Sequence, residues 1–106
     1  MTWMCSMEKK NLDFYKRCVD IWGEDAQIKM CIEEMSELTK ELCKNWRKSK
    51  KDTPEQIEHI CEEIADVQNM IDQMQLIFGI EKVEKYREEK IIRTQKRLDE
   101  EMNSNG

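Results

Sequence analysis

The sequence predicts an all-α protein, an antiparallel bundle of about four helices that is completed by oligomerisation. Charged residues make up 39% of the 106 residues, and only three Gly and one Pro interrupt the chain, a composition typical of long helices. Apolar residues recur every three or four positions, which is the period of an amphipathic helix. Because this length suits one hydrophobic core, we predict a single domain over 1–106, with loose ends at 1–8 and 103–106.

The first two predicted helices are separated by Gly23. The first covers roughly 9–22 and ends there, because glycine commonly terminates helices. The second covers about 25–46 and carries a narrow apolar stripe. That stripe consists of Ile28, Cys31, Met35, Leu38, Leu42 and Trp46.

The third predicted helix begins with a capping box, in which Thr53 is the N-cap and Gln56 closes the box. It ends before Gly79, and the fourth helix follows at about 81–102. The stripe of the third helix consists of Ile57, Ile60, Ile64, Val67, Ile71, Met74 and Phe78. Each stripe must be buried against a neighbour, and so short a chain has few neighbours to offer. We therefore expect a homodimer or homotetramer.

Charge and composition exclude several classes of function. A formal net charge of −5 argues against binding a nucleic-acid polymer, since that requires a basic face. No apolar run approaches the roughly 20 residues that cross a bilayer, and the first residues do not resemble a signal peptide, so we expect no membrane partner. The five cysteines contain no Cys-x-x-Cys pair, and reduced thiols favour a cytoplasmic location.

Two acidic motifs stand beside the apolar stripes of the second and third helices. They are Glu33-Glu34-x-x-Glu37 and Glu63-x-x-Asp66, and the i,i+3 spacing places each pair on one helix face. Two carboxylates about 6 Å apart repel by roughly 3 kcal/mol at an effective dielectric of about 20, so four converging acids need a cation. Oxygen-only ligands suit Mg²⁺, with Mn²⁺ as a substitute.

These acids have two other interpretations. An acidic chain can carry such motifs by chance on a solvated face, which would make them ordinary surface residues. A di-iron centre in a helical bundle requires two Glu-x-x-His pairs. The sequence has one histidine, His59, and the residue three positions before it is Gln56 instead of a glutamate. The pairing of the motifs on two helices favours a magnesium site over both.

The paired motifs resemble those of the MazG-like all-α nucleoside triphosphate pyrophosphohydrolases of the short, single-domain type. The stretch from Trp22-Gly23 to Gln27 is also similar to these enzymes. The resemblance implies Mg²⁺-dependent hydrolysis of a (deoxy)nucleoside triphosphate to its monophosphate and pyrophosphate, in nucleotide-pool housekeeping. It implies that the metal ligands are Glu34, Glu37, Glu63 and Asp66. It also implies catalytic roles for Glu34 and for Glu33, the latter as a base or as support for the ligands.

Other residues are candidates for binding the substrate. Lys90 and Arg93 form either a phosphate clamp or a solvated basic face of the fourth helix. Trp22 and Gln27 line a base pocket or belong to the core. The longer relatives have a second domain and a Cys-Pro-Trp-Asp segment that are missing here, so base preference does not carry over. The alternative function is a non-enzymatic helical oligomerisation or interaction module.

Overall fold

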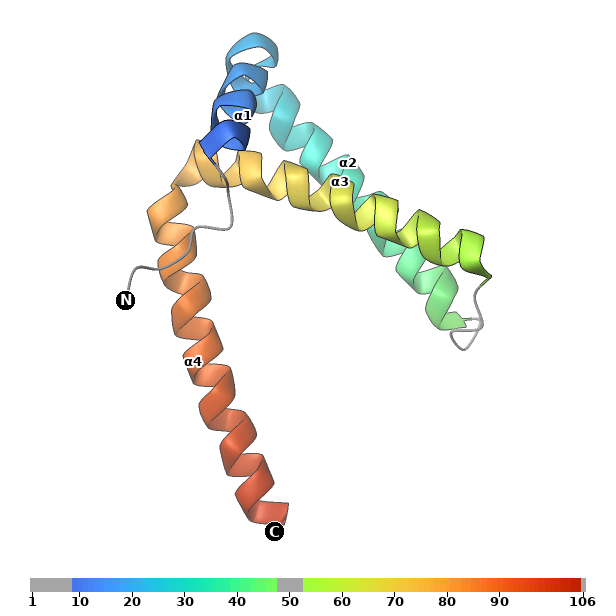
Figure 1. Ribbon diagram of the computed structural model, residues 1–106, viewed down its shortest axis with the longest axis vertical. Helices are drawn as coiled ribbons and strands as arrows, with labels where there is room; N and C mark the ends of the chain where they lie inside the picture. The colour runs from blue at the N-terminus through green and yellow to red at the C-terminus, as the bar shows by residue number, and fades with distance from the viewer. Residues whose placement is uncertain (1–8, 48–52, 106) are drawn as a thin grey trace. The chain divides into compact units, whose positions relative to one another are not determined.

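The computed structural model describes residues 9–47 and 53–105, which fold into four helices and no strand. The helices are α1 (Lys9–Trp22), α2 (Glu24–Arg47), α3 (Pro54–Phe78) and α4 (Ile80–Asn105) (Figure 1). The all-α prediction is therefore confirmed. The chain forms two compact units, one that contains α1 to α3 and one that contains α4.

Local signals in the sequence place the helix ends. Gly23 has a φ of 88°, a value that side chains rarely adopt, and its amide donates to the carbonyl of Val19 at 2.8 Å to close α1. At the start of α3 the amide of Gln56 donates to Thr53 Oγ1 at 3.2 Å, and the amide of Thr53 donates to Gln56 Oε1 at 3.1 Å. This reciprocal pair is the predicted capping box. Gly79, with a φ of 130°, separates α3 from α4.

In the first unit α2 and α3 run antiparallel, and α1 packs against both (Figure 1). Two side-chain pairs fix the direction of α2 and α3: Gln27 bonds to Gln73 at one end, and Glu41 lies 3.6 Å from His59 Nε2 towards the other. The Tyr15 hydroxyl of α1 donates to Asn69 Oδ1 of α3 at 2.9 Å. The buried apolar residues of the described chain are Tyr15, Cys18, Cys31 and Met70.

The predicted stripes of α2 and α3 are only partly buried. Cys31 is buried and Leu38 half-buried, but Met35, Leu42 and Trp46 of the same stripe are exposed. On α3, Ile60 and Val67 are half-buried. The helices meet along a face turned towards Gln27, Glu34, Glu63 and Gln73, which leaves the far edge of each stripe outside. The exposed residues of the two stripes and the neighbouring Ile32 are called here the apolar face of α2 and α3, which comprises Ile32, Met35, Leu42, Trp46, Ile57, Ile64, Ile71 and Phe78.

Among the described residues, the second unit contains a single helix, the 26-residue α4. Arg87 forms an ion pair with Glu84 at 3.1 Å, and Arg97 pairs with Glu101 at 3.5 Å. The helix continues to Asn105, so it includes three of the four residues at 103–106 that the sequence predicted to be loose. The loose segment predicted at 1–8 lies outside the described residues. No helix in the described part of the chain is long and apolar enough to cross a membrane.

Candidate metal centre

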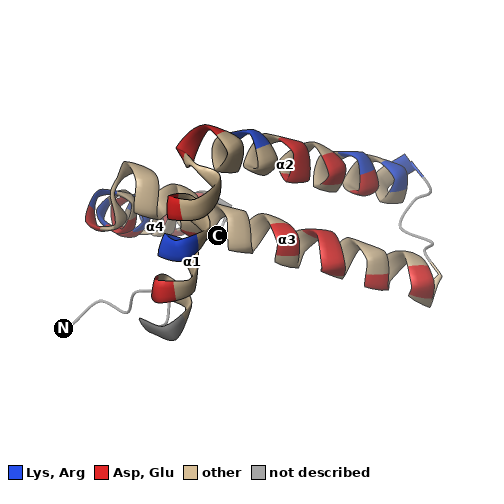
Figure 2. Cartoon of the chain, turned by 90° about the horizontal axis from the view of Figure 1, so that it is seen from above, with Lys and Arg blue, Asp and Glu red and all other residues tan. Residues whose placement is uncertain are grey.

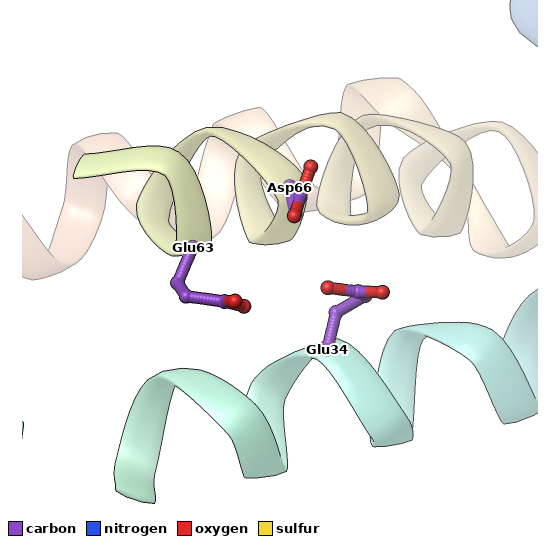
Figure 3. A group of neighbouring side chains, drawn as sticks. All are labelled: Glu34, Glu63 and Asp66. Carbon is purple, nitrogen blue, oxygen red and sulfur yellow. The ribbon is translucent and has the colours of Figure 1, made fainter. Parts of the chain in front are cut away.

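Three carboxylates from two helices converge between α2 and α3. Glu34 comes from α2, and Glu63 and Asp66 stand one turn apart on α3. One carboxylate oxygen of each residue lies within 4.8 Å of the others. Figure 3 shows the Glu34 and Glu63 side chains extending towards each other across the space between the helices, with Asp66 beside them. The i,i+3 spacing on α3 and the antiparallel pairing with α2 together build this group.

The electrostatics of this group are unfavourable without a cation. Burial raises the pKa of the Glu34 carboxyl, and the negative charges of Asp66 and Glu63 raise it further. Glu63 Oε2 is buried and accepts no hydrogen bond from the described residues. Within the same residues, no Lys or Arg forms an ion pair with any of the three acids. A buried acceptor facing like charges is costly unless something positive binds there.

The donor set suits a hard divalent cation. All donors are carboxylate oxygens, which Mg²⁺ and Mn²⁺ prefer. An ion bound at about 2.1 Å from each oxygen would draw the three oxygens somewhat closer together than 4.8 Å, which small rotations of the side chains can supply. Because Mg²⁺ takes six ligands, monodentate binding by three residues leaves three positions for water or phosphate oxygens.

The other two acids of the predicted site lie beside this group. Glu37 and Glu33 are exposed on α2, and neither belongs to the group of three convergent carboxylates in the described structure. Both are close enough that their charges add to the raised pKa of Glu34. Figure 2 shows acidic residues along both α2 and α3. The structure thus brings together three of the four predicted ligands and keeps the fourth within electrostatic reach.

The residues predicted to bind substrate fall in three places. Gln27 is 2% exposed, and its Nε2 donates to Gln73 Oε1, so its amide bonds inside the bundle. Trp22 is exposed at the end of α1. Lys90 and Arg93 are exposed on α4, in the other unit, and their role as a phosphate clamp stays a prediction.

Two residues near the site were not singled out from the sequence. Gln73 lies seven residues after Asp66, just as Gln27 lies seven residues before Glu34, so each amide is two turns along the same inner face. Asn69, three residues after Asp66, accepts the Tyr15 hydroxyl and ties α1 to α3. The sequence offered a signal for both residues, because Asn69 and Gln73 continue the three-four spacing of the acidic motif along α3.

The geometry of these side chains is the main guide to function. No protein-family model, curated protein or solved structure matches this chain.

Proposed function

We propose that this protein is a Mg²⁺-dependent nucleoside triphosphate pyrophosphohydrolase that cleaves a (deoxy)nucleoside triphosphate to its monophosphate and pyrophosphate. The single observation that carries the proposal is the group formed by Glu34, Glu63 and Asp66, in which a buried oxygen of Glu63 accepts no hydrogen bond from the described residues. It agrees with the resemblance of the two acidic motifs to the MazG-like enzymes.

The three carboxylates would hold the cation in this account. When bound, Mg²⁺ supplies positive charge for the phosphate oxygens and lowers the pKa of a bound water. Glu37 contributes negative charge beside the group and is the fourth proposed ligand. Glu33 is exposed next to Glu34, where it can accept the proton of the attacking water or support a ligand.

The proposed reaction is balanced without any other reagent. The water oxygen forms a bond to the α-phosphorus, and the bond between that phosphorus and the α–β bridging oxygen breaks. Pyrophosphate leaves with the bridging oxygen, and a carboxylate takes the proton of the water. In the described part of the chain, the convergent group consists of Glu34, Glu63 and Asp66 and includes neither Cys nor His, so we favour direct attack by water.

Two further roles belong to this proposal. Lys90 and Arg93 are the proposed phosphate-binding residues, Lys90 through the positive charge of its ammonium group and Arg93 through a guanidinium fork that matches the geometry of phosphate oxygens. The exposed indole of Trp22 would stack on the base. Gln27 would act through its bond to Gln73, holding the ends of α2 and α3 together two turns from the carboxylates, instead of touching the base itself.

The alternative proposal is a non-enzymatic helical interaction module. The exposed apolar face of α2 and α3 suits such a role. Interaction alone gives no reason for three convergent carboxylates with a buried, unpartnered oxygen between the helices, so the enzyme is the better account.

The test is pyrophosphate release from a panel of nucleoside and deoxynucleoside triphosphates in Mg²⁺, with the parent and two variants. Glu63→Gln removes a proposed ligand, and Glu62→Gln changes an exposed neighbour on α3 that is outside the carboxylate group. We expect pyrophosphate and no orthophosphate from the parent and from Glu62→Gln, no product in chelator, and a loss of at least about 100-fold in Glu63→Gln. Orthophosphate as the product, or equal rates in Glu62→Gln and Glu63→Gln, would refute the proposal.

A further inference from the structure

Asn69 of α3 extends the row of side chains that begins with Glu63 and Asp66. At about 100° per residue, Asp66 is turned about 60° from Glu63 around the helix, and Asn69 is turned about 60° more in the same sense. Ile64 of the apolar face is turned about 100° in the opposite sense. Glu63 is half-buried, whereas Asp66 and Asn69 are exposed. Asn69 therefore lies one turn beyond Asp66, on the side of α3 away from the apolar face.

The exposed acids of α2 lie on the same side of the helix pair as Asn69. Glu37 and Glu33 are turned about 60° and 100° from Glu34, in the sense that leads from Glu63 to Asn69 on α3. Because α2 and α3 are antiparallel, rotations in the same sense bring side chains to one side of the pair. Glu33 and Glu37 are exposed there. A ligand of a bound cation would therefore approach the carboxylates from this side.

The side-chain amide of Asn69 is held in one orientation by Tyr15 of α1. The Tyr15 hydroxyl donates to Asn69 Oδ1 at 2.9 Å. Tyr15 is 7% exposed, and the ring of Phe14 stands edge-on to it with the ring centroids 5.7 Å apart. Burial raises the pKa of Tyr15 and the charge of Asp72 raises it further, so the hydroxyl keeps its proton at neutral pH. The hydroxyl thus occupies the carbonyl end of the amide and leaves the Nδ2 end to donate elsewhere.

The Nδ2 group of Asn69 supplies the kind of donor that the carboxylate group lacks. An amide nitrogen carries two N–H donors, whereas ionised carboxylates only accept hydrogen bonds. Among the described residues, Asn69 Nδ2 meets no acceptor. The i,i+3 spacing places the Cβ atoms of Asn69 and Asp66 about 5–6 Å apart. A phosphate held by the cation beside Asp66 would therefore have a neutral donor within one helical turn, and hydrogen bonds to such anions are stronger than those between neutral groups.

We propose that Asn69 binds a phosphate oxygen of the substrate through Nδ2, and that Tyr15 is the positioning residue that orients this amide. The inference rests on the proposed function, because the bound cation brings the phosphate to this side of the helix pair. An amide that is already ordered loses less freedom when it binds, which favours affinity. In the described structure α1 supplies no residue to the carboxylate group. Its packing on α3 contributes to substrate binding through Tyr15 and Asn69.

The experiment measures binding of inorganic triphosphate to the full-length chain in Mg²⁺ by calorimetry, since this probe carries the phosphate groups of every nucleoside triphosphate and no base. Asn69→Asp keeps an oxygen that accepts the Tyr15 hydroxyl, but replaces the donors by a negative charge. Gln68→Glu makes the matching change from amide to acid at the next residue, which is exposed and turned about 100° from Asn69 towards the apolar face. Tyr15→Phe removes only the hydroxyl. Circular dichroism checks that each variant keeps the helix content of the parent.

We expect Asn69→Asp to bind triphosphate at least about 10-fold more weakly than Gln68→Glu does, and Tyr15→Phe to bind it about 3-fold more weakly than the parent. Tyr15→Phe should bind Mn²⁺ alone as tightly as the parent, which separates the orientation of Asn69 from general damage to the site. Adding Tyr15→Phe to Asn69→Asp should weaken triphosphate binding no further, because Tyr15 acts through Asn69.

The outcomes distinguish this inference from the proposed function. A parent that binds no triphosphate in Mg²⁺ would overturn both. A parent that binds triphosphate, with Asn69→Asp as tight as Gln68→Glu, would overturn the role of Asn69 alone. Equal triphosphate affinity in Tyr15→Phe and the parent, or a parallel loss of Mn²⁺ binding in Tyr15→Phe, would overturn the positioning role of Tyr15. If Tyr15→Phe does not fold, the comparison of Asn69→Asp with Gln68→Glu still decides the proposal.

Discussion

Neutralising Glu63 should stabilise the metal-free protein, because it removes one of three negative charges that lie close together. The carboxylate oxygens of Glu34, Glu63 and Asp66 lie within 4.8 Å of one another. At that separation each pair of charges repels by about 3 kcal/mol at an effective dielectric of about 20. The Glu63→Gln substitution keeps the size of the side chain and removes two of these three repulsions.

The net gain in the free energy of unfolding is smaller than the sum of the two repulsions. Asp66 is exposed, so water screens its charge, and the raised pKa of Glu34 reduces the negative charge carried by that group. The new amide can also donate hydrogen bonds to the neighbouring carboxylates. We expect Glu63→Gln to raise the free energy of unfolding in chelator at neutral pH by about 1–2 kcal/mol. For a domain of about 100 residues this corresponds to a midpoint roughly 5–10 °C higher.

The assay is thermal unfolding followed by circular dichroism, in chelator and in Mg²⁺. Mg²⁺ should raise the midpoint of the parent and of Glu62→Gln, because a ligand stabilises the state that binds it. It should barely move the midpoint of Glu63→Gln. A Glu63→Gln variant that is less stable than the parent without metal and responds to Mg²⁺ as the parent does would contradict this prediction. In that case the acid would have a structural partner and no role in binding a cation.

Three further results follow from the same structure. Because the pKa of Glu34 is raised above its ordinary value of 4.5, the folded chain holds a proton that the unfolded chain has lost at pH values between the two. The free energy of unfolding of the metal-free parent should therefore fall as the pH rises above 4.5 through the raised pKa, and denaturant titrations of Glu34→Gln should show a smaller fall. In the buried pair, Gln27→Leu should lower the free energy of unfolding in urea by about 1–3 kcal/mol, because Gln73 loses its hydrogen-bond donor. Replacing both Gln27 and Gln73 by Leu should lower it by less than the sum of the two single losses, and a loss equal to that sum would contradict this prediction. Calorimetry should show that Glu37→Gln weakens Mg²⁺ binding less than Asp66→Asn does, because Asp66 belongs to the convergent group and Glu37 does not. The reverse order would contradict this prediction and show that the site reorganises when the cation binds.

The helices were predictable because their boundaries depend on residues close in sequence. Gly23 and Gly79 adopt positive φ values that favour glycine, and Thr53 caps α3 through Gln56 three residues later. The sequence placed the first helix at 9–22, and the structure has it at Lys9–Trp22. Such signals act within one helical turn and require no knowledge of the tertiary fold.

The rotation of α2 against α3 could not be predicted in the same way. The stripe pattern suggested that Met35, Leu42 and Trp46 would face the partner helix, yet Trp46 is 74% exposed. The contact face is set by long-range pairs such as Gln27 with Gln73, which no local pattern reveals. Fold class therefore followed from the period of the apolar residues, while the face that each helix buries did not.

The candidate site shows the same division between local and long-range information. The i,i+3 spacing correctly placed Glu63 and Asp66 on one face of α3, because that relation is local to one helix. Glu34 and Glu37 have the same spacing on α2, but only Glu34 points into the group. Which of the two acids points at α3 depends on a rotation of α2 that the sequence does not encode locally.

Binding of Mn²⁺ to the isolated protein tests the central claim most directly, because it requires neither a substrate nor knowledge of the base. Electron paramagnetic resonance measures free Mn²⁺ during titration of the parent, Glu63→Gln and the control Glu62→Gln, followed by competition with Mg²⁺. We expect the parent and Glu62→Gln to bind Mn²⁺ that Mg²⁺ displaces, and Glu63→Gln to bind Mn²⁺ at least about 10-fold more weakly. Absence of binding to the parent, or equal affinity in Glu63→Gln, would contradict it.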